Sequence, residues 1–174
     1  VRINDDSGDS LLKVNGASGE DDSFSMSIWV NFSSIAGVQT IIWNCTNAGT
    51  NSGSPSNPPD VQYSLDKDSD DFFRFRLYDT NTNHGMGQKN AYMEVKGYPS
   101  DTMQNKTTHG VLVNHWYNVV VTYDGSGEDT GMEIYSNGAP VVSRSSAKYS
   151  YVKTRSSANN TVYIGQKFDN NGSG

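Results

Sequence analysis

The amino-acid sequence predicts an all-β protein, an antiparallel β-sandwich or jelly roll of about ten or more short strands with essentially no helix. Three observations lead to this fold class. Many short segments alternate apolar with polar residues, which is typical of strands that bury one face. Clusters of Gly, Asn, Asp, Ser and Pro separate these segments and favour turns. No segment combines apolar residues at positions i, i+3, i+4 and i+7 with helix caps.

Residues 24–32 form the clearest predicted strand. Phe24, Met26, Ile28, Val30 and Phe32 lie on one side of it, so this side is expected to face a buried core. The same alternation predicts strands at residues 61–65, 73–77, 91–95, 117–123, 132–136 and 161–164. Shorter strands are expected at residues 1–3, 11–14, 40–44, 111–113 and 139–142.

Two turns between residues 115 and 138 indicate that neighbouring strands run antiparallel. Asp124-Gly125 interrupts the alternating segment 117–123, because glycine readily adopts the positive φ of a tight turn. Asn137-Gly138 follows the segment 132–136, and this dipeptide is the strongest short-range signal of a β-hairpin.

Three long loops are expected between the strands. They comprise residues 46–60, residues 80–89 together with 97–110, and residues 143–160. Long loops on a rigid sandwich are frequent sites of binding, so these segments are where a ligand is first expected.

Length and charge limit the range of functions. The chain has 174 residues and a formal net charge of -6, so we expect a single domain over residues 1–174 that binds neither nucleic acid nor acidic membranes. No apolar run approaches the ~18 residues of a membrane span, so no membrane insertion is expected.

The first residue is Val1 and no signal peptide is present, which suggests part of a longer protein. Cys45 is the only cysteine; it is interpreted as a small buried hydrophobic residue.

Five segments carry a resemblance to a known superfamily. They are FSMSIWVNF (24–32), YSLDKDSDDFFRFRLYD (63–79), HWYNVVVTYDGSG (115–127), MEIYSNGAPV (132–141) and TVYIGQ (161–166). In this order they are similar to the laminin-G-like, concanavalin A-like lectin/glucanase superfamily. The resemblance implies a jelly roll of two packed antiparallel sheets. Its members bind glycans or proteins, hydrolyse polysaccharides, or serve as structural modules, and the fold does not choose among these functions.

The end of the chain departs from the pattern of the superfamily. Members usually continue after the YIG strand with a strand that carries a Gly-x-Ile-Asp-like pattern, whereas this chain ends with DNNGSG at residues 169–174. We therefore expect the strand of Tyr163, or the one beside it, to lie at a sheet edge that is open or covered by a neighbouring chain.

The sequence does not indicate an enzyme. Glycoside hydrolysis requires two carboxylates that flank a cleft. The resemblance implies that hydrolases of the superfamily carry a Glu-x-Asp-x-x-Glu strand, and this motif is absent here. The acidic cluster of Asp66, Asp68, Asp70 and Asp71 is interpreted as a solvated hairpin tip.

No cofactor is required by this interpretation, but calcium is a candidate. The resemblance implies that some members bind calcium at the rim of the sandwich, and this cation prefers clustered carboxylates and carbonyls from loops. The predicted ligands are Asp124, Glu128 and Asp129, which lie in one turn. An alternative set is Asp66, Asp68 and Asp70.

Aromatic side chains are the predicted ligand-binding groups, because glycan recognition combines exposed rings with polar hydrogen-bonding groups. The predicted binding residues are Trp29, Tyr92, Tyr98, Tyr149, Tyr151 and Arg155. Trp29 lies on the polar side of its strand. It is therefore expected either to form the base of a binding groove or to pack under a loop or against another subunit. The segment from Tyr149 to Arg155 is basic and aromatic, which suits contact with sugar or protein.

The function predicted from the sequence is non-catalytic binding or adhesion, with glycan as the ligand. The domain is expected in a secreted, cell-surface or virion protein, and a homo-oligomer is one expected form. The alternative is a structural module of an assembly, such as a phage fibre, capsid decoration or surface layer, with other subunits as partners. A polysaccharide hydrolase is the third interpretation, which the missing carboxylate motif argues against.

Overall fold

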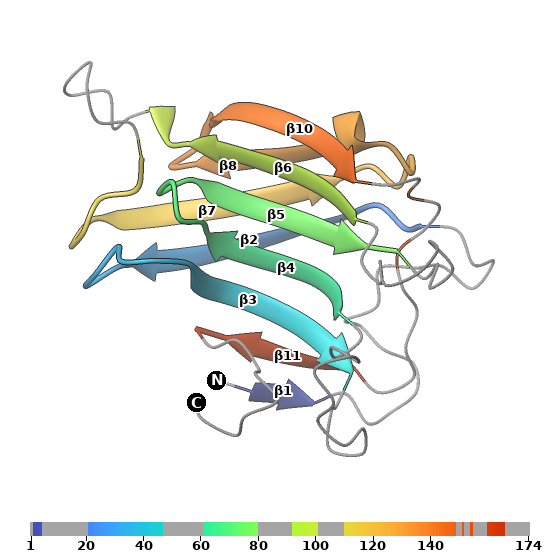
Figure 1. The fold of residues 1–174 in the computed structure, drawn as a ribbon, viewed down its shortest axis with the longest axis horizontal. Coiled ribbons are helices and arrows are strands. Elements are labelled where there is room, and N and C mark those ends of the chain that lie inside the picture. Colours follow the sequence, from blue (N-terminus) through green and yellow to red (C-terminus); the bar gives the residue numbers. More distant parts are fainter. Residues whose placement is uncertain are drawn as a thin grey trace.

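The structure is a computed structural model that describes residues 2–4, 21–46, 61–79, 92–100, 110–148, 151, 154 and 160–165. These residues form two antiparallel sheets packed face to face, with the larger sheet in front in Figure 1. The large sheet contains, in spatial order, β1 (Arg2–Asn4), β11 (Asn160–Ile164), β3 (Gln39–Thr46), β4 (Val61–Lys67), β5 (Phe73–Tyr78), β6 (Tyr92–Tyr98) and β10 (Val142–Lys148). The small sheet contains β2 (Phe24–Asn31), β7 (Trp116–Tyr123), β8 (Met132–Ser136) and β9 (Ala139–Pro140).

The main core lies between the two sheets and is built by the predicted alternation. Every second side chain of β7 from Tyr117 to Tyr123 is buried. Phe73, Phe75 and Leu77 of β5 are fully buried on the facing sheet. The sandwich predicted from the sequence is thus confirmed, and the side chains that are out of phase with the core are directed to the two outer faces.

A second hydrophobic cluster lies on the outer face of the large sheet. Its members are Trp43, Cys45, Val61, Tyr78 and Tyr163, with Tyr92 packed against them. Cys45 is fully buried in this cluster, as predicted for a small hydrophobic residue.

One predicted loop contains a strand. Residues 142–148, most of which were assigned to the loop 143–160, form β10 and pair antiparallel with β6 along their whole length. The sequence SRSSAK lacks apolar alternation, so its pairing depends on backbone hydrogen bonds to β6, which no side-chain pattern records. The predicted strand 111–113 was also wrong, because only Val113 makes an isolated bridge, to Phe32. The predicted strand 11–14 lies outside the described residues.

The strand of Tyr163 is not a sheet edge. β11 pairs with β3 on one side and with β1 on the other, where Tyr163 lies opposite Arg2. The strand beside it, β1, is the last strand of the large sheet in the described part of the chain. Of the two predicted alternatives, the second is therefore the one observed: the edge is formed by the strand beside that of Tyr163, a segment from the opposite end of the chain.

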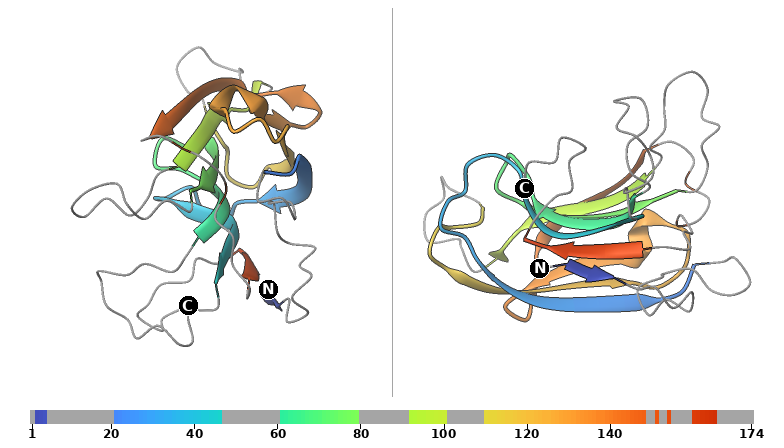
Figure 2. Two further views of the ribbon diagram at one scale, coloured as in Figure 1. Left: turned by 90° about the vertical axis from the view of Figure 1, so that its right-hand side faces the viewer. Right: turned by 90° about the horizontal axis from the view of Figure 1, so that it is seen from below.

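The two sheets are offset at the β2 side. β2 is the last described strand of the small sheet, whereas the large sheet continues from β3 to β11 and β1. Figure 2 shows that the large sheet curls on this side toward the level of β2. The offset leaves the side of β2 that faces away from β7 next to β3 and β11.

Within the described residues, no helix is long and apolar enough to span a bilayer.

Candidate functional site

Two tryptophans and two asparagines occupy the outer face of the small sheet. Trp29 and Asn31 point outward from β2, because the alternate residues of this strand pack toward the core. Trp116 and Asn118 point outward from β7 for the same reason. Trp29 lies opposite Asn118, and Asn31 lies opposite Trp116. We call these four residues the Trp–Asn patch.

The two indole rings of the patch are largely exposed to solvent. Trp29 is 64% exposed and Trp116 is 61% exposed, more than any other large hydrophobic residue in the described part of the chain. A ligand that covers both rings removes a large apolar surface from water, which favours association.

The amide side chains of the patch add hydrogen-bonding groups. Asn118 Nδ2 donates to Ser27 Oγ at 3.2 Å, and the backbone N–H of Asn118 donates to Asn137 Oδ1 at 2.9 Å. These contacts hold Asn118 in place between the two strands. The side chain of Asn31 makes no hydrogen bond within the described residues, so both its carbonyl and its amino group can bind a ligand.

A groove of about 470 Å³ runs along the free side of β2 and adjoins the patch. Its size lies within the usual range of ligand sites, roughly 300–1,000 Å³. It is lined by Ile28, Trp29, Val30, Asn31, Phe32, Gln39, Thr40, Ile41, Trp116, Ile164 and Gly165. Both sheets contribute to this lining, so the offset between them creates the groove.

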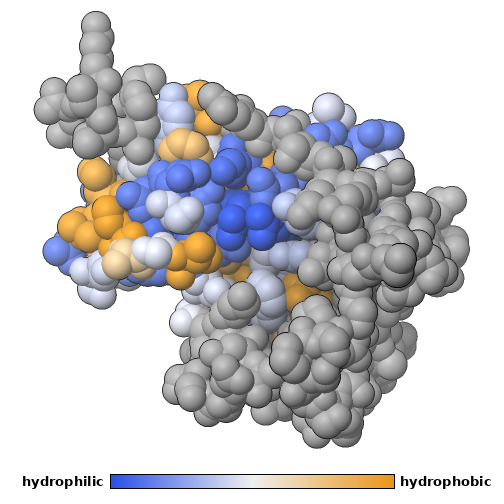
Figure 3. All heavy atoms as spheres, in the orientation of Figure 1, coloured by the Kyte–Doolittle hydropathy of each residue, from blue (hydrophilic) through white to orange (hydrophobic). Residues whose placement is uncertain are grey.

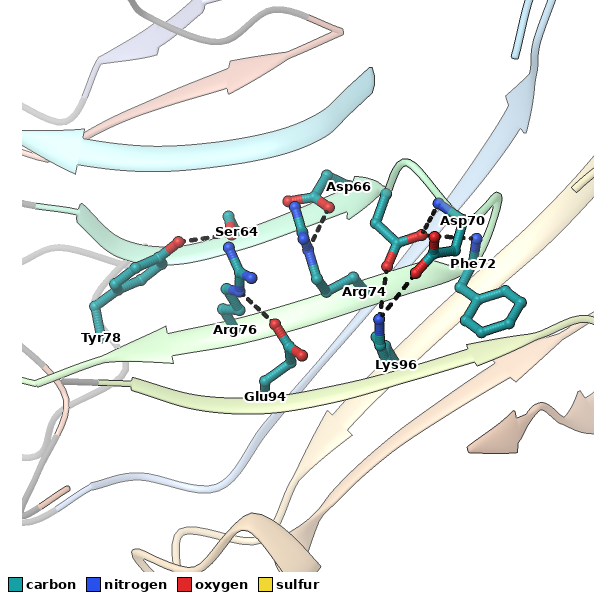
Figure 4. A network of polar contacts seen from close by, with 10 residues as sticks. Ser64, Asp66, Asp70, Phe72, Arg74, Arg76, Tyr78, Glu94 and Lys96 are labelled. Atoms are coloured by element: carbon teal, nitrogen blue, oxygen red, sulfur yellow. Dashed lines mark hydrogen bonds and ion pairs between the residues drawn. The ribbon is translucent and has the colours of Figure 1, made fainter. Parts of the chain in front are cut away.

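Part of the outer face of the large sheet, outside the hydrophobic cluster, is charged instead. Figure 3 shows a hydrophilic area over β4, β5 and β6, and Figure 4 shows the polar contacts within it. Arg74 Nε donates to Asp66 Oδ1 at 2.7 Å, and Arg76 Nε donates to Glu94 Oε2 at 2.6 Å. The guanidinium of Arg76 also lies 4.6 Å from the centre of the Tyr92 ring.

The acidic cluster after β4 is not a simple solvated turn. Asp66 is 4% exposed and Asp68 is 2% exposed, which contradicts the prediction for these two residues. Lys96 Nζ donates to Asp68 Oδ2 at 3.1 Å and to Asp70 Oδ2 at 3.4 Å. Positive side chains from β5 and β6 thus neutralise carboxylates from β4 and its turn, and this pairing across strands offsets the cost of burying them.

The pKa values of the two buried carboxyl groups shift in opposite directions. Burial raises the pKa of Asp66, and the charge and hydrogen bond of Arg74 only partly offset this effect. Burial also acts to raise the pKa of Asp68, but hydrogen bonds from the backbone of Phe72, from Lys96 and from the backbone of Asp70 outweigh it, so the pKa is lowered. The second carboxylate is therefore held in its charged form by its donors.

The structure separates the predicted binding residues rather than gathering them into one site. Trp29 belongs to the small sheet, whereas Tyr92 lies on the outer face of the large sheet beside Tyr78. Tyr98 ends β6 and packs against Phe72, with ring centres 5.5 Å apart. Tyr149 and Arg155 lie outside the described residues.

Tyr151 holds two parts of the chain together. Its hydroxyl group donates to Asp21 Oδ2 at 2.7 Å, and the hydroxyl of Tyr123 donates to the same oxygen at 2.8 Å. The backbone N–H of Thr154 donates to Asp21 Oδ1 at 2.7 Å. Burial and the adjacent carboxylate raise the pKa of Tyr151 above its usual range. These contacts indicate that Tyr151 stabilises the fold.

The predicted calcium ligands lie in the turn between β7 and β8. Asp124 Oδ1 accepts a hydrogen bond from the backbone N–H of Ser126 at 2.9 Å, and hydrogen bonds from Ser126 lower the pKa of Asp124. Glu128 and Asp129 lead into a short 3-10 turn at Asp129–Gly131. No group of three or more His, Cys, Asp or Glu side chains that could hold a metal ion occurs among the described residues. Calcium binding stays a prediction.

Trp116 is the site residue that sequence reasoning missed. The alternation predicts a strand at residues 117–123, which does not include Trp116. The alternation of the strand contains the information needed to find it. Trp116 lies on the side of β7 opposite to the core residues, as Trp29 does on β2. The prediction that Trp29 packs under a loop is wrong, because its side chain is largely exposed.

Comparisons with known proteins agree with this architecture. The sequence model of the Laminin_G_3 family, described as the Concanavalin A-like lectin/glucanases superfamily, matches residues 6–174. Comparisons with curated proteins and with solved structures returned no match. The family match spans nearly all of the chain and agrees with the two-sheet sandwich. This chain therefore belongs to the laminin-G-type domains of the concanavalin A-like lectin/glucanase superfamily.

Proposed function

We propose that this domain is a non-catalytic binding module that holds carbohydrate on the Trp–Asn patch. The observation that carries this proposal is the pair of exposed indole rings, Trp29 and Trp116, on neighbouring strands with an amide side chain opposite each ring. The proposed role is adhesion by a protein that acts outside the cell or on a virion surface.

The chemistry of the patch suits sugars. A pyranose ring presents C–H groups on its faces and hydroxyl groups around its rim. Indole rings provide flat apolar surfaces for the faces, while Asn31 and Asn118 provide donors and acceptors for the hydroxyl groups. Tryptophan is also one of the residues that most often dominates the free energy of binding at an interface.

The proposed module does not catalyse a reaction. Hydrolysis of a glycosidic bond uses one carboxylic acid as a general acid and a second carboxylate as a base or nucleophile. The groove beside the patch has no carboxylate among its lining residues. On the large sheet, Asp66 and Glu94 are each bound by an arginine, so their oxygens are engaged in ion pairs.

A structural module of an assembly is the second candidate, and one observation favours it. β2 pairs only with β7 among the described strands, and the groove along its other side is largely apolar. A subunit that docks here would cover Trp29. An interface of this kind should bury more than ~1,000 Å² in the intact particle.

The test is binding of soluble polysaccharides by affinity gel electrophoresis, with Trp29→Ala and Trp116→Ala as the site variants. Each substitution should weaken binding by about 30-fold, because a central aromatic anchor contributes roughly 2 kcal/mol. Trp43→Phe is the matched control, since the third tryptophan is buried on the other sheet. Both site variants should keep the circular dichroism spectrum of the wild type.

Two outcomes would reject the carbohydrate proposal. One is wild-type affinity in both site variants, which would place the ligand elsewhere. The other is no binding of any polysaccharide together with a native mass above that of the monomer that falls to the monomer mass in Trp29→Ala. This second result would favour the assembly module.

A further inference from the structure

Charged residues are distributed unequally along the chain. The segment from Ser23 to Pro59 contains no Asp, Glu, Lys, Arg or His, although the whole chain has 13 Lys and Arg and 19 Asp and Glu. The segment from Gly110 to Tyr123 contains only His115 from these residue types. These two uncharged segments include all of β2 and β7.

The fold places the two uncharged segments side by side. β2 and β7 pair antiparallel from Phe24 opposite Tyr123 to Asn31 opposite Trp116. The loop that joins β2 to β3 is also uncharged. Gln39 and Thr40, the first residues of β3, line the groove. His115, the one histidine in the segment from Gly110 to Tyr123, packs against the Tyr117 ring with ring centres 4.7 Å apart.

The groove and the patch are consequently free of formal charge. All lining residues of the groove are apolar or carry an uncharged polar group, and the patch adds only Asn118. On the large sheet, by contrast, Arg74, Arg76 and Lys96 each bind a carboxylate.

This charge distribution narrows the class of ligand. A sulfated or uronic acid polysaccharide binds through Arg or Lys, which form charge-assisted hydrogen bonds to its anionic groups. The patch offers no such group, and the net charge of -6 repels a polyanion. A neutral sugar requires only the stacking surfaces and amide groups that the patch provides.

The spacing of the indole rings indicates a ligand with several sugar units. Trp29 and Trp116 occupy diagonal positions on paired strands, which are typically about 7–8 Å apart. The groove continues from the patch along Ile28, Val30 and the facing Ile164. A chain of sugars can cover both rings and extend along the groove, whereas a single terminal sugar covers one ring.

We infer that the ligand of the Trp–Asn patch is a neutral polysaccharide chain, bound without a metal ion and without dependence on salt. This inference rests on the proposed carbohydrate function and names its substrate class. Because few ions are released or screened, the affinity should change less than about twofold between 50 and 500 mM NaCl. EDTA should leave the affinity unchanged, since no carboxylate lines the site.

The experiment compares neutral and acidic probes on the same chain. The neutral probes are mixed-linkage β-glucan, xyloglucan and galactomannan, and the acidic probes are heparin and alginate. At least one neutral polymer should retard the wild-type protein at both salt concentrations, and neither acidic polymer should. Six-unit oligosaccharides of the neutral polymer should bind at least tenfold more tightly than two-unit oligosaccharides in calorimetry.

The outcomes separate this inference from the function on which it rests. Binding to heparin or alginate that is lost in Trp29→Ala and falls with salt would overturn the neutral class and keep carbohydrate binding. Equal affinity for two-unit and six-unit oligosaccharides would overturn the extended chain. Failure of all five polymers to bind would overturn both the inference and the proposed function. Trp43→Phe serves as the folded control throughout.

Discussion

The two outer faces of this sandwich use opposite chemistry. On the large sheet, Asp66, Arg74, Arg76 and Glu94 are mostly buried and satisfy one another across strands. On the small sheet, the Trp–Asn patch is uncharged, and its indole rings are exposed. Charged groups that are paired with one another have few free donors or acceptors for a ligand. Exposed aromatic rings, in contrast, offer apolar surface that a ligand can cover. We therefore propose that the charged cluster contributes stability and that the uncharged Trp–Asn patch contributes recognition.

Substitutions on the charged face should change the free energy of unfolding and leave binding intact. Substitutions on the Trp–Asn patch should do the reverse. The following four predictions test the contrast in order of decreasing effect.

Arg76→Met should have the largest effect on stability. The substitution leaves Glu94 without its 2.6 Å ion pair and removes the guanidinium from the Tyr92 ring. Because the glutamate then stays largely buried and unpaired, the free energy of unfolding should fall by about 3 kcal/mol, measured by urea denaturation. The double variant Arg76→Met/Glu94→Met should recover most of this loss. A change below ~0.5 kcal/mol in the single variant would show that the charged face is not structural.

Asp68→Asn should remove a pH-dependent part of the stability. The pKa of Asp68 is lower in the folded protein than the ordinary value near 3.9, so the folded state binds its proton less tightly than the unfolded state. The resulting stabilisation is complete above about pH 4 and is lost as pH falls through the folded pKa. At pH 7 the substitution should cost about 1–3 kcal/mol.

The pH profile of unfolding is the measurement that checks this second prediction. The wild type should lose stability below about pH 4, and the Asp68→Asn variant should have a flatter profile there. Asp66 acts with the opposite sign, because burial raises its pKa and its ionisation opposes folding as pH rises. Equal acid-induced losses in wild type and variant would contradict the assignment to Asp68.

Replacing both exposed tryptophans by phenylalanine should change stability by less than ~0.5 kcal/mol, as is usual for surface positions. Trp29 and Trp116 should account for nearly all acrylamide quenching of the protein's fluorescence, because Trp43 is buried. The double variant should therefore show blue-shifted emission with little quenching. Strong protection of Trp29 in the wild-type protein would reveal a covered patch, as expected for an assembly module.

Glu133→Gln should have the smallest effect. Glu133 is an exposed carboxylate on β8 that accepts a hydrogen bond from the Tyr135 hydroxyl, and this contact raises the pKa of Tyr135. Both the melting temperature and polysaccharide affinity should stay within experimental error, since exposed pairs contribute little. A marked loss of binding would extend the recognition surface across the small sheet and introduce charge into it.

Part of the candidate site was predictable from the sequence. The polar phase of β2 correctly placed Trp29 on an outer face, and the same reasoning applied to β7 would have found Trp116. Tyr92 was predicted to bind a ligand as an outward-facing aromatic residue of its strand, and Tyr151 as part of the basic and aromatic segment from Tyr149 to Arg155. Tyr92 instead lies beneath the guanidinium of Arg76, and Tyr151 is hydrogen-bonded to Asp21. A sequence pattern shows that an aromatic residue is out of phase, but not what covers it.

The fold class, the inward and outward side of most strands and the uncharged character of β2 and β7 can all be predicted from the residue pattern. These properties follow from the two-residue period of a strand, which is local. Which side chains contact one another depends instead on how the strands pair and pack. Arg76 and Glu94 are 18 residues apart, and Ser27 and Asn118 are 91 residues apart. The same holds for β10, whose polar sequence gives no alternation but which pairs fully with β6. Strand order and register bring such partners together, and both are set by backbone hydrogen bonds between segments that are distant in the chain.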